Sequence, residues 1–283
     1  MEEKIMITCD SGIDIDPELV KKYNIKVLPI RLKFGANEAL DDGSVSPDDI
    51  IEFYEKENDF VITAPPTVQD IFRFFTKFSH MGYTVIHFAT SAKISSGYEV
   101  AKSAAESFNK VHIIDSKSYS IGGMPIVLKA AQLAAEGTPS ENIVKTCTEL
   151  TDRVRMHLLL SNLKYMHSSG RINVGQNLML SVLGMMPSAS IEDGDFAVRK
   201  RYRGSLEKAS VKFIDDLMKE AKNTDRSCFY LGHTGMDNAI IEECRKEVNQ
   251  VSDFDNVLVT RCGCGVTSFN GTGCLIVCWV ETQ

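Results

Sequence analysis

Hydroxyl-bearing residues gather in four short stretches, each placed directly after an apolar run of strand length. Two of these stretches precede amphipathic helical patterns: Thr63-Ala64-Pro65-Pro66-Thr67, and Thr90-Ser91-Ala92-Lys93-Ile94-Ser95-Ser96-Gly97. The other two are Asp10-Ser11-Gly12 and Asp115-Ser116-Lys117-Ser118-Tyr119-Ser120. Backbone N–H groups at a helix N-terminus lack partners and carry partial positive charge, so clustered hydroxyls beside them form a neutral cradle for an anion. Anion binding is therefore the chemistry that these residues favour.

The loop after Thr63 is unusually stiff for a connection between a strand and a helix. Pro65 and Pro66 remove two backbone donors and hold the approach to the helix extended. Such a loop keeps the hydroxyls of Thr63 and Thr67 at fixed positions. Thr67 is also a good N-cap for the following helix. Capping and anion binding both stay open for any single hydroxyl, and two such loops at one sheet edge strengthen the case for binding.

Sequence motifs of nucleotide-binding and hydrolytic sites are missing from the chain. There is no GxxxxGK[ST], no GxGxxG after the first strand and no GxSxG. Gly263-x-Gly265 comes late and is not expected to precede a helix. His87 and His112 fall in predicted strands and favour a structural role, while His167 and His233 have no paired nucleophile nearby in sequence. Nucleotide binding and nucleophilic catalysis are therefore disfavoured.

The eight cysteines are spread along the chain and often lie in apolar segments. Their one cluster, Cys262-Gly263-Cys264 followed by Cys274 and Cys278, does not have the paired CxxC or histidine spacing of a zinc site. We expect small buried thiols, no metal and no cofactor.

The first half of the chain alternates between strand and helix patterns. Strands are predicted over residues 5–8, 26–32, 61–63, 85–89 and 111–115. Helices are predicted over residues 17–23, 47–56, 68–78, 98–108 and 121–136. This rhythm predicts a mostly parallel sheet with helices on both faces, and ligands gather beyond the carboxyl ends of such strands. The four hydroxyl-rich stretches lie at those ends.

The second half has a different pattern. Strands are predicted over residues 158–160, 185–191, 196–198, 227–232, 257–261 and 275–280, and helices over 162–167, 175–183, 204–221 and 237–248. Asp193-Gly194 marks a hairpin turn. The fold class predicted is α/β: an N-terminal domain, residues 1–152, that carries the hydroxyl-rich loops, and a C-terminal α+β domain, residues 153–283, with a largely antiparallel sheet.

Composition is that of a globular protein, with 43% hydrophobic and 24% charged residues among 283. The net charge is −7, whereas nucleic-acid binding usually needs a basic face. The short run 199–203 is locally basic, and we interpret it as a solvated strand end. The chain has neither a secretory signal nor an apolar stretch of membrane-spanning length. We therefore expect a cytoplasmic protein without integral membrane association.

Five ordered motifs resemble those of the DegV family of bacterial fatty-acid-binding proteins. They are ITCDSGIDIDPELVKKYNIKVLPIRLKFG, TAPPT, TSAKISSGYEVAKSAA, VHIIDSKSYSIGGM and SNLKYMHSSGRI. The resemblance extends from Ile5 to Val280. It implies an α/β domain and a second domain with an antiparallel sheet, with the acyl chain between or within them. Some members act as the acyl-binding subunit of a fatty acid kinase.

The resemblance also implies site residues. The fatty acid carboxylate is expected on Thr63 and Ser95, and Arg171 corresponds to the arginine of a GGRI-like motif in the second domain. The full set of expected ligand-binding residues is Ser11, Thr63, Ser95, Ser96, Gly97, Arg171, Phe269 and Asn270. An apolar slot for the tail would draw on residues 178–186, Ile30, Phe34, Phe269 and Leu275.

The chain departs from the family pattern at several of these positions. Ala64-Pro65-Pro66-Thr67 stands where SQPS is usual, and Ile94-Ser95-Ser96-Gly97-Tyr98 where LSGTY is usual. Near the C-terminus the family commonly has HTGPG, whereas this chain has Phe269-Asn270-Gly271-Thr272-Gly273. Phe269 thus replaces a histidine that contacts the head group in kinase-linked members. Met186, before Pro187, stands where a lysine is common.

Three functional hypotheses follow. The first is a non-enzymatic protein that binds a long-chain fatty acid and presents it to a fatty acid kinase, as a monomer or weak dimer with a role in phospholipid metabolism. The second is a phosphotransferase or hydrolase that acts on a small anion at the same loops. The third, favoured by Phe269, is a binding module for another lipid or apolar carboxylate.

Overall fold

A computed structural model describes residues 3–161, 163–168, 185–221 and 223–282. The chain divides into two compact units. Unit 1 comprises Met1–Val45, Thr63–Asp152 and Asp193–Asp195, and unit 2 comprises Ser46–Ile62, Arg153–Glu192 and Phe196–Gln283. The predicted split after residue 152 differs from this division because residues 46–62 belong to unit 2 and the hairpin turn 193–195 to unit 1.

Unit 1 is built on a four-stranded parallel sheet with the order β2-β1-β6-β7. Its strands are β2 (Lys26–Leu28), β1 (Ile5–Asp10), β6 (Thr84–Ala89) and β7 (Val111–Asp115). From β1 the chain moves to β2 on one side, and β6 and β7 lie on the other side. The order therefore changes direction between β1 and β6, which is where open parallel sheets bind ligands.

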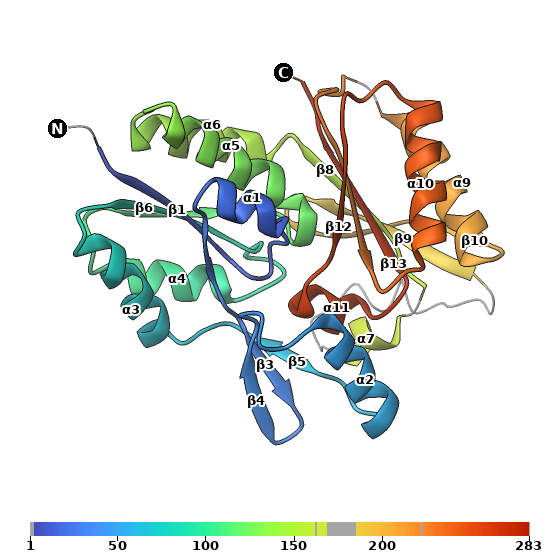
Figure 1. Ribbon diagram of the computed structural model, residues 1–283, viewed down its shortest axis with the longest axis horizontal. Coiled ribbons are helices and arrows are strands. Elements are labelled where there is room, and N and C mark those ends of the chain that lie inside the picture. Colours follow the sequence, from blue (N-terminus) through green and yellow to red (C-terminus); the bar gives the residue numbers. More distant parts are fainter. Residues whose placement is uncertain (1–2, 162, 169–184, 222, 283) are drawn as a thin grey trace. The chain divides into compact units, whose positions relative to one another are not determined.

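Helices cover both faces of this sheet, as predicted (Figure 1). On one face lie α3 (Val68–Ser79) and α4 (Gly97–Ala105), whose Phe75 and Ala101 pack with Met6 and Val85 of the sheet. On the other face lie α5 (Met124–Ala135) and α6 (Ser140–Thr151), with the short α1 (Pro17–Lys22) near α5. Both faces of β1 and β6 are buried, which explains their unbroken apolar runs.

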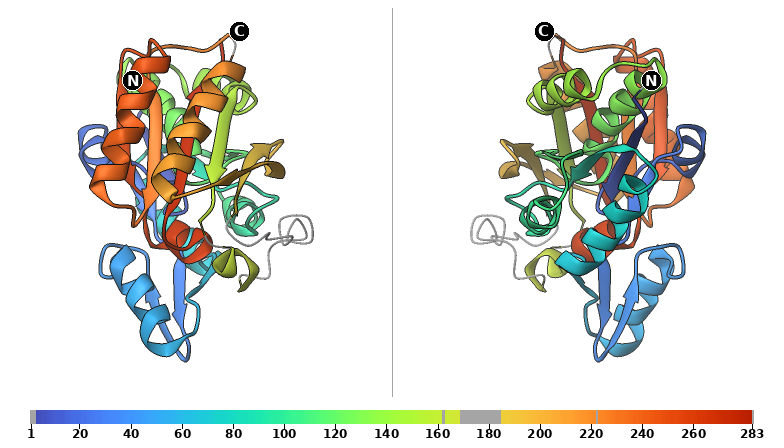
Figure 2. Two further views of the ribbon diagram at one scale, coloured as in Figure 1. Left: turned by 90° about the vertical axis from the view of Figure 1, so that its right-hand side faces the viewer. Right: turned by 90° about the vertical axis from the view of Figure 1, so that its left-hand side faces the viewer.

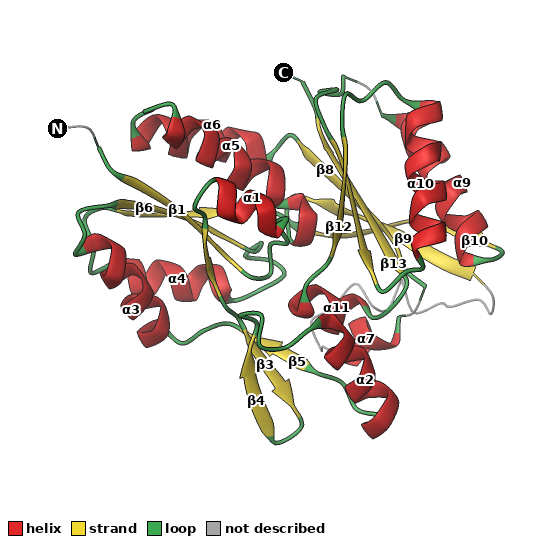
Figure 3. Ribbon diagram, in the orientation of Figure 1, coloured by secondary structure: helices red, strands yellow, loops and turns green. Residues whose placement is uncertain are grey.

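Two predictions for unit 1 are corrected by the strand pairing. The predicted strand 26–32 is two strands, β2 and β3 (Arg31–Phe34), in different sheets. The predicted strand 61–63 is β5 (Ile62–Ala64), which belongs to a separate three-stranded sheet, β4-β3-β5, with β4 (Asn37–Leu40). Figure 3 shows this small sheet apart from the parallel one. Thr63 therefore does not follow a strand of the parallel sheet.

Unit 2 contains a six-stranded, mostly antiparallel sheet with the order β10-β9-β8-β13-β11-β12. The strands are β8 (Val154–Leu159), β9 (Met185–Glu192), β10 (Asp195–Arg203), β11 (Phe229–Thr234), β12 (Val257–Arg261) and β13 (Cys274–Val280). Asp193 and Gly194, at φ +46° and +81°, form the predicted hairpin turn between β9 and β10. Of the strands in the described part of the chain, β11 and β12 are parallel neighbours, whereas β13 pairs antiparallel with β11 and β8, and β8 antiparallel with β9.

The helices of unit 2 lie in two groups. One face of the sheet is covered by α9 (Leu206–Glu220) and α10 (Asn238–Val251), which lie side by side in the views of Figures 1 and 2. Phe213 of α9 and Val248 of α10 pack with Val277 and Trp279 of β13 in one apolar core. A second group consists of α2 (Pro47–Glu57), α7 (Lys164–Ser168) and α11 (Cys264–Asn270).

Two helices were not predicted. In α6, Ile143, Cys147 and Leu150 form a buried stripe at helical spacing, but threonines and β-branched residues weaken the signal. The helix α11 follows Gly263, contrary to expectation, and all of its residues are buried. A short helix buried on every side has no polar face, so its amphipathic period is absent. The predicted helix 175–183 lies outside the described residues. No helix in the described ranges is long and apolar enough to cross a membrane.

Candidate functional site

A buried carboxylate links two of the hydroxyl-rich loops at the ends of the neighbouring strands β1 and β6. Asp10, at the end of β1, accepts hydrogen bonds from the Thr90 N–H (2.7 Å) and the Thr90 hydroxyl (2.7 Å). It also accepts one from the Gly12 N–H at 2.9 Å. Burial raises the pKa of the Asp10 carboxyl, and the bonds from Thr90 and Gly12 oppose that effect. Both residues lie in the predicted hydroxyl-rich stretches, but neither is among the predicted ligand-binding residues.

Gly97, the first residue of α4, lies where three loops of unit 1 meet. A Cβ atom added to it would be 3.3 Å from Ser95 Oγ, 3.8 Å from Pro65 Cβ and 3.9 Å from Asp10 Oδ2. The loop after β5, the loop after β6 and the end of β1 therefore converge on one point. Glycine has no Cβ atom to fill that point.

The Ser95 side chain lies at this meeting point and is half-buried. Its backbone N–H donates to Ser91 O, and its hydroxyl oxygen accepts from the Gly97 N–H at 3.1 Å. The hydroxyl proton of Ser95 can therefore be directed at a ligand. Ser96 is the N-cap residue of α4, is exposed and makes no side-chain capping bond.

The two threonines of the proline loop have different surroundings. Thr67 is an N-cap: its hydroxyl donates to Asp70 Oδ2 at 2.6 Å and accepts from the Asp70 N–H at 3.2 Å, a complete capping box. Thr63 lies half-buried in β5, two residues before Pro65, which packs near Gly97. The structure thus shows that Thr67 caps α3, while Thr63 precedes Pro65, the residue of this loop that lies near Gly97.

Other hydroxyl groups of the predicted stretches form hydrogen bonds with backbone groups. Ser11 Oγ accepts from the Ile30 N–H at 3.0 Å and so holds the segment after β2. In the loop after β7, the Ser116 hydroxyl donates to Ser118 O at 2.9 Å. In the loop after β6, the Ser91 hydroxyl donates to Gly194 O at 2.6 Å. These bonds explain part of the hydroxyl richness without a ligand.

The predicted site residues of unit 2 lie at the end of α11. Phe269 and Asn270 are both buried, and the Phe269 ring lies 5.7 Å from the ring of Phe196. Leu275, a predicted slot residue, is part of the apolar core beneath α9 and α10. Arg171 and residues 178–184 lie outside the described residues.

Metal ligands and thiols of the described residues were the remaining candidates for chemistry. Across residues 3–161, 163–168, 185–221 and 223–282, no group of three or more His, Cys, Asp or Glu side chains is placed to hold a metal ion. None of the eight cysteines, all of which lie in the described ranges, forms a disulfide, and seven of them are buried. Burial raises the pKa of Cys9 and of Cys147, the latter to about 12, so that both thiols stay protonated at neutral pH.

Replacing Asp10 with alanine is expected to lower the free energy of unfolding of unit 1 by about 3 kcal/mol, because two donors of buried Thr90 and the part-buried Gly12 N–H lose their acceptor. Urea unfolding followed by amide NMR signals of β1 and β6 measures the change. Thr90→Val is the matched control: it removes one of the three bonds and should cost about 1 kcal/mol. Equal costs for the two variants would contradict the role assigned to the carboxylate.

The sequence of this chain is similar to a family model and to several known proteins. Residues 4–282 match the family model described as "Uncharacterised protein, DegV family". A DegV domain-containing protein of Clostridium perfringens is 30% identical over 227 residues, 77% of this chain and 80% of the relative. Another, from Caldanaerobacter subterraneus, is 27% identical over 275 residues, 95% of this chain and 96% of the relative.

Solved structures agree in fold. A DegV family protein from Thermus thermophilus, described by its fatty acid binding, superposes with a TM-score of 0.91 at 22% identity, over 99% of this chain and 100% of that one. One from Eubacterium eligens, loaded with heptadecanoic acid, has a TM-score of 0.84 at 20% identity over 99% and 100% of the two chains. By the match along nearly its whole length, this chain belongs to the DegV family.

Proposed function

We propose that this protein binds a long-chain fatty acid without catalysis, with the carboxylate held by Thr63 and Ser95. The observation that carries the proposal is the convergence of the Ser95 loop and the proline loop on Gly97. The fatty acids described for the Thermus thermophilus and Eubacterium eligens proteins of the same family support it.

The head-group chemistry suits a carboxylate. Ser95 has a hydroxyl proton to donate while its oxygen accepts from Gly97. The N-terminus of α4, a nine-residue helix that begins at Gly97, adds partial positive charge. Ser11 would act through the backbone that it holds, because its oxygen accepts from Ile30. The contact of Arg171 with the ligand or with a partner stays a prediction.

Affinity would come from the tail rather than from the head group. Burying about 15 methylene groups at roughly 0.8 kcal/mol each yields about 12 kcal/mol before the costs of association. Hydrogen bonds to the carboxylate offset its desolvation and set its orientation. The contribution of Phe269 and Asn270 to an apolar slot for the tail stays a prediction. In this proposal Phe269 adds apolar surface where kinase-linked relatives have a histidine.

Presentation of the bound acid to a fatty acid kinase in the cytoplasm is the further step of this proposal. A phosphotransferase or hydrolase acting on a small anion, and a module for another lipid, are the alternatives. Native mass spectrometry of protein purified from cells separates them. A co-purified long-chain acid supports the proposal, an unexpected lipid supports the module, and an empty protein that turns over a small phosphate or ester supports the enzyme.

The head-group assignment predicts the effect of removing either hydroxyl. Thr63→Val and Ser95→Ala should each weaken binding of palmitic acid about tenfold, the value of one hydrogen bond to a charged group. Displacement of a fluorescent fatty acid from the delipidated protein measures the change. Thr67→Ala is the matched control, because it removes a hydroxyl of the same loop that serves only as a helix cap. Unchanged affinity in both head-group variants, with fatty acid still bound, would refute the assignment and leave the lipid-binding function standing.

A further inference from the structure

The turn between β9 and β10, residues 193–195, belongs to unit 1 and packs against the loop that follows β6. The Ser91 hydroxyl donates a hydrogen bond to Gly194 O at 2.6 Å, and both residues are buried. Beside this bond, on the surface, the Lys93 ammonium lies 2.7 Å from the Asp193 carboxylate. A Cβ atom on Gly194 would lie 2.6 Å from Ser91 Oγ. Glycine therefore permits the close approach of the turn to the loop.

Ser91 connects this turn to the rest of the loop. Its carbonyl accepts from the Ser95 N–H at 2.9 Å, and its own N–H donates to Ser118 O at 2.8 Å in the loop after β7. Its hydroxyl proton is used by Gly194 O, and its hydroxyl oxygen accepts from the Lys93 N–H at 3.3 Å. Because Ser91 is 0% exposed, it is not positioned to contact a ligand itself. It fixes the loop that carries Ser95 by bonds to two other segments.

The position of Ser95 depends on the position of Ser91. The N–H groups of Ile94 and Ser95 both donate to Ser91 O, at 3.0 and 2.9 Å, so a shift of Ser91 shifts Ser95 with it. Without the Ser91 hydroxyl, the buried Gly194 carbonyl would lose this donor, and a movement of the turn or of the loop would lower that cost. A displacement of about 1 Å is enough to weaken a directional contact to a ligand.

We propose that the bond between Ser91 and Gly194 positions the Ser95 hydroxyl for the ligand carboxylate, so that the turn 193–195 sets the affinity for the head group. This inference rests on the proposed function, because it concerns the carboxylate that is assigned to Ser95. Ser91 is a positioning residue, since it acts through Ser95 and does not touch the ligand. Its contribution should therefore depend on the charge of the head group and not on the tail.

Two ligands with the same tail length test the inference. Palmitic acid has a carboxylate, and hexadecan-1-ol has an uncharged head group in its place. We expect Ser91→Ala to weaken binding of palmitic acid about fivefold and of hexadecan-1-ol less than about twofold, because a hydrogen bond to a charged group contributes more than one to a neutral group. Displacement of a fluorescent fatty acid from the delipidated protein measures both affinities.

A double variant shows whether Ser91 acts through Ser95. In a Ser95→Ala background, Ser91→Ala should cause no further loss of affinity for palmitic acid, because the hydroxyl that it positions is gone. Gly194→Ala breaks the same contact from the side of the turn, since its Cβ atom would displace Ser91 Oγ. It should show the same loss, restricted to palmitic acid. Each variant is first checked for a native amide spectrum, and if one fails to fold the other still decides.

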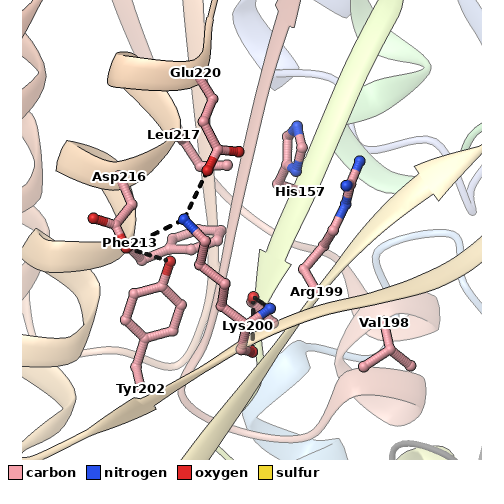
Figure 4. A pocket seen from close by; sticks show the side chains of 10 residues that line it. His157, Val198, Arg199, Lys200, Tyr202, Phe213, Asp216, Leu217 and Glu220 are labelled. Atoms are coloured by element: carbon pink, nitrogen blue, oxygen red, sulfur yellow. Dashed lines mark hydrogen bonds and ion pairs between the residues drawn. The ribbon is translucent and has the colours of Figure 1, made fainter.

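The matched control, Ser188→Ala, comes from a pocket of about 310 Å³ in unit 2 (Figure 4). Ser188 lines this pocket, is 2% exposed, donates to Lys200 O at 3.0 Å and accepts from the Lys200 N–H at 3.1 Å. Figure 4 shows the Lys200 ammonium paired with Glu220 and Asp216 of α9, at 2.7 and 3.7 Å. The variant removes the same kinds of hydrogen bond as Ser91→Ala, at a residue outside the proposed site. Affinity for palmitic acid should stay unchanged.

Failure of the proposed function and failure of the inference differ in outcome. If the proposed function is wrong, the wild-type protein binds no palmitic acid, or Ser95→Ala leaves its affinity unchanged, and the inference falls with it. If only the inference is wrong, Ser95→Ala weakens palmitic acid, while Ser91→Ala either leaves it unchanged, weakens both ligands equally, or adds its full loss in the Ser95→Ala background.

Discussion

Gly271→Ala is expected to lower the free energy of unfolding of unit 2 by about 4 kcal/mol, the sum of backbone strain and a steric clash. Gly271 has φ +72° and ψ −170°, a conformation that is essentially restricted to glycine. A Cβ atom at this position would lie 2.3 Å from Cδ2 of Tyr165. The Tyr165 ring cannot move aside freely, because it packs against Tyr54 and Phe60 at 4.9 and 5.1 Å. Strain and clash therefore act together.

Urea unfolding followed by Trp279 fluorescence measures this effect, since Trp279 is the only tryptophan of the chain and lies in the core of unit 2. Gly235→Ala is the matched control. Gly235 also has a positive φ, +61°, but its added Cβ would meet the tip of Ile51 at 3.2 Å and Thr272 Cγ2 at an ordinary contact distance of 3.9 Å. We expect a cost of about 1 kcal/mol there. If the two variants lost equal stability, backbone conformation alone would account for both, and the Tyr165 contact would be irrelevant.

Lowering the pH from 6.5 to 5 is expected to reduce the free energy of unfolding of unit 1 by about 2 kcal/mol through His87 alone. The His87 ring is 1% exposed, lies 2.9 Å from the Thr8 hydroxyl and packs edge-on against Phe75. Burial lowers its pKa from 6.5 to about 3. Below pH 6.5 the unfolded chain takes up a proton that the native state excludes. Stability is therefore complete above pH 6.5 and falls by about 1.4 kcal/mol per pH unit down to pH 3.

The contribution of His87 is isolated by comparison with His87→Gln, which keeps a hydrogen-bonding side chain but does not titrate. Urea unfolding followed by amide signals of β1 and β6 at several pH values reports unit 1. The raised pKa of Asp10 acts with the opposite sign, because the native carboxyl binds its proton before the unfolded one does. Both proteins contain Asp10, so its effect cancels in the difference. Identical pH dependence in the two proteins would show that His87 is protonated in the native state.

A high density of hydroxyl residues in a loop does not by itself identify a ligand-binding residue. Thr67 and Ser116 have the same residue chemistry as Thr63 and Ser95, yet Thr67 closes a capping box and Ser116 bonds to its own loop. Local sequence patterns do not distinguish a hydroxyl that serves the backbone from one that faces a ligand. The difference depends on which acceptors the fold brings near, such as the convergence of three loops on Gly97.

Much of the architecture follows from local pattern. Strands β7 and β12 have the predicted bounds, and the helices that begin at Pro17, Pro47 and Val68 begin where predicted. Periodicity, capping residues and turn residues are properties of neighbouring positions in the chain, so they can be recognised in the sequence before the fold is known. The hairpin at Asp193-Gly194 is of the same kind.

What only the tertiary structure decided is which segments pair and which polar groups find partners. The pairing of β5 with β3, the division of residues 26–34 between two sheets and the burial of α11 on every side each depend on contacts between distant residues. So does the link from Asp10 to Thr90, which are 80 positions apart. Strand partners and buried hydrogen bonds are chosen by three-dimensional proximity, and the residue pattern along the chain does not contain that information.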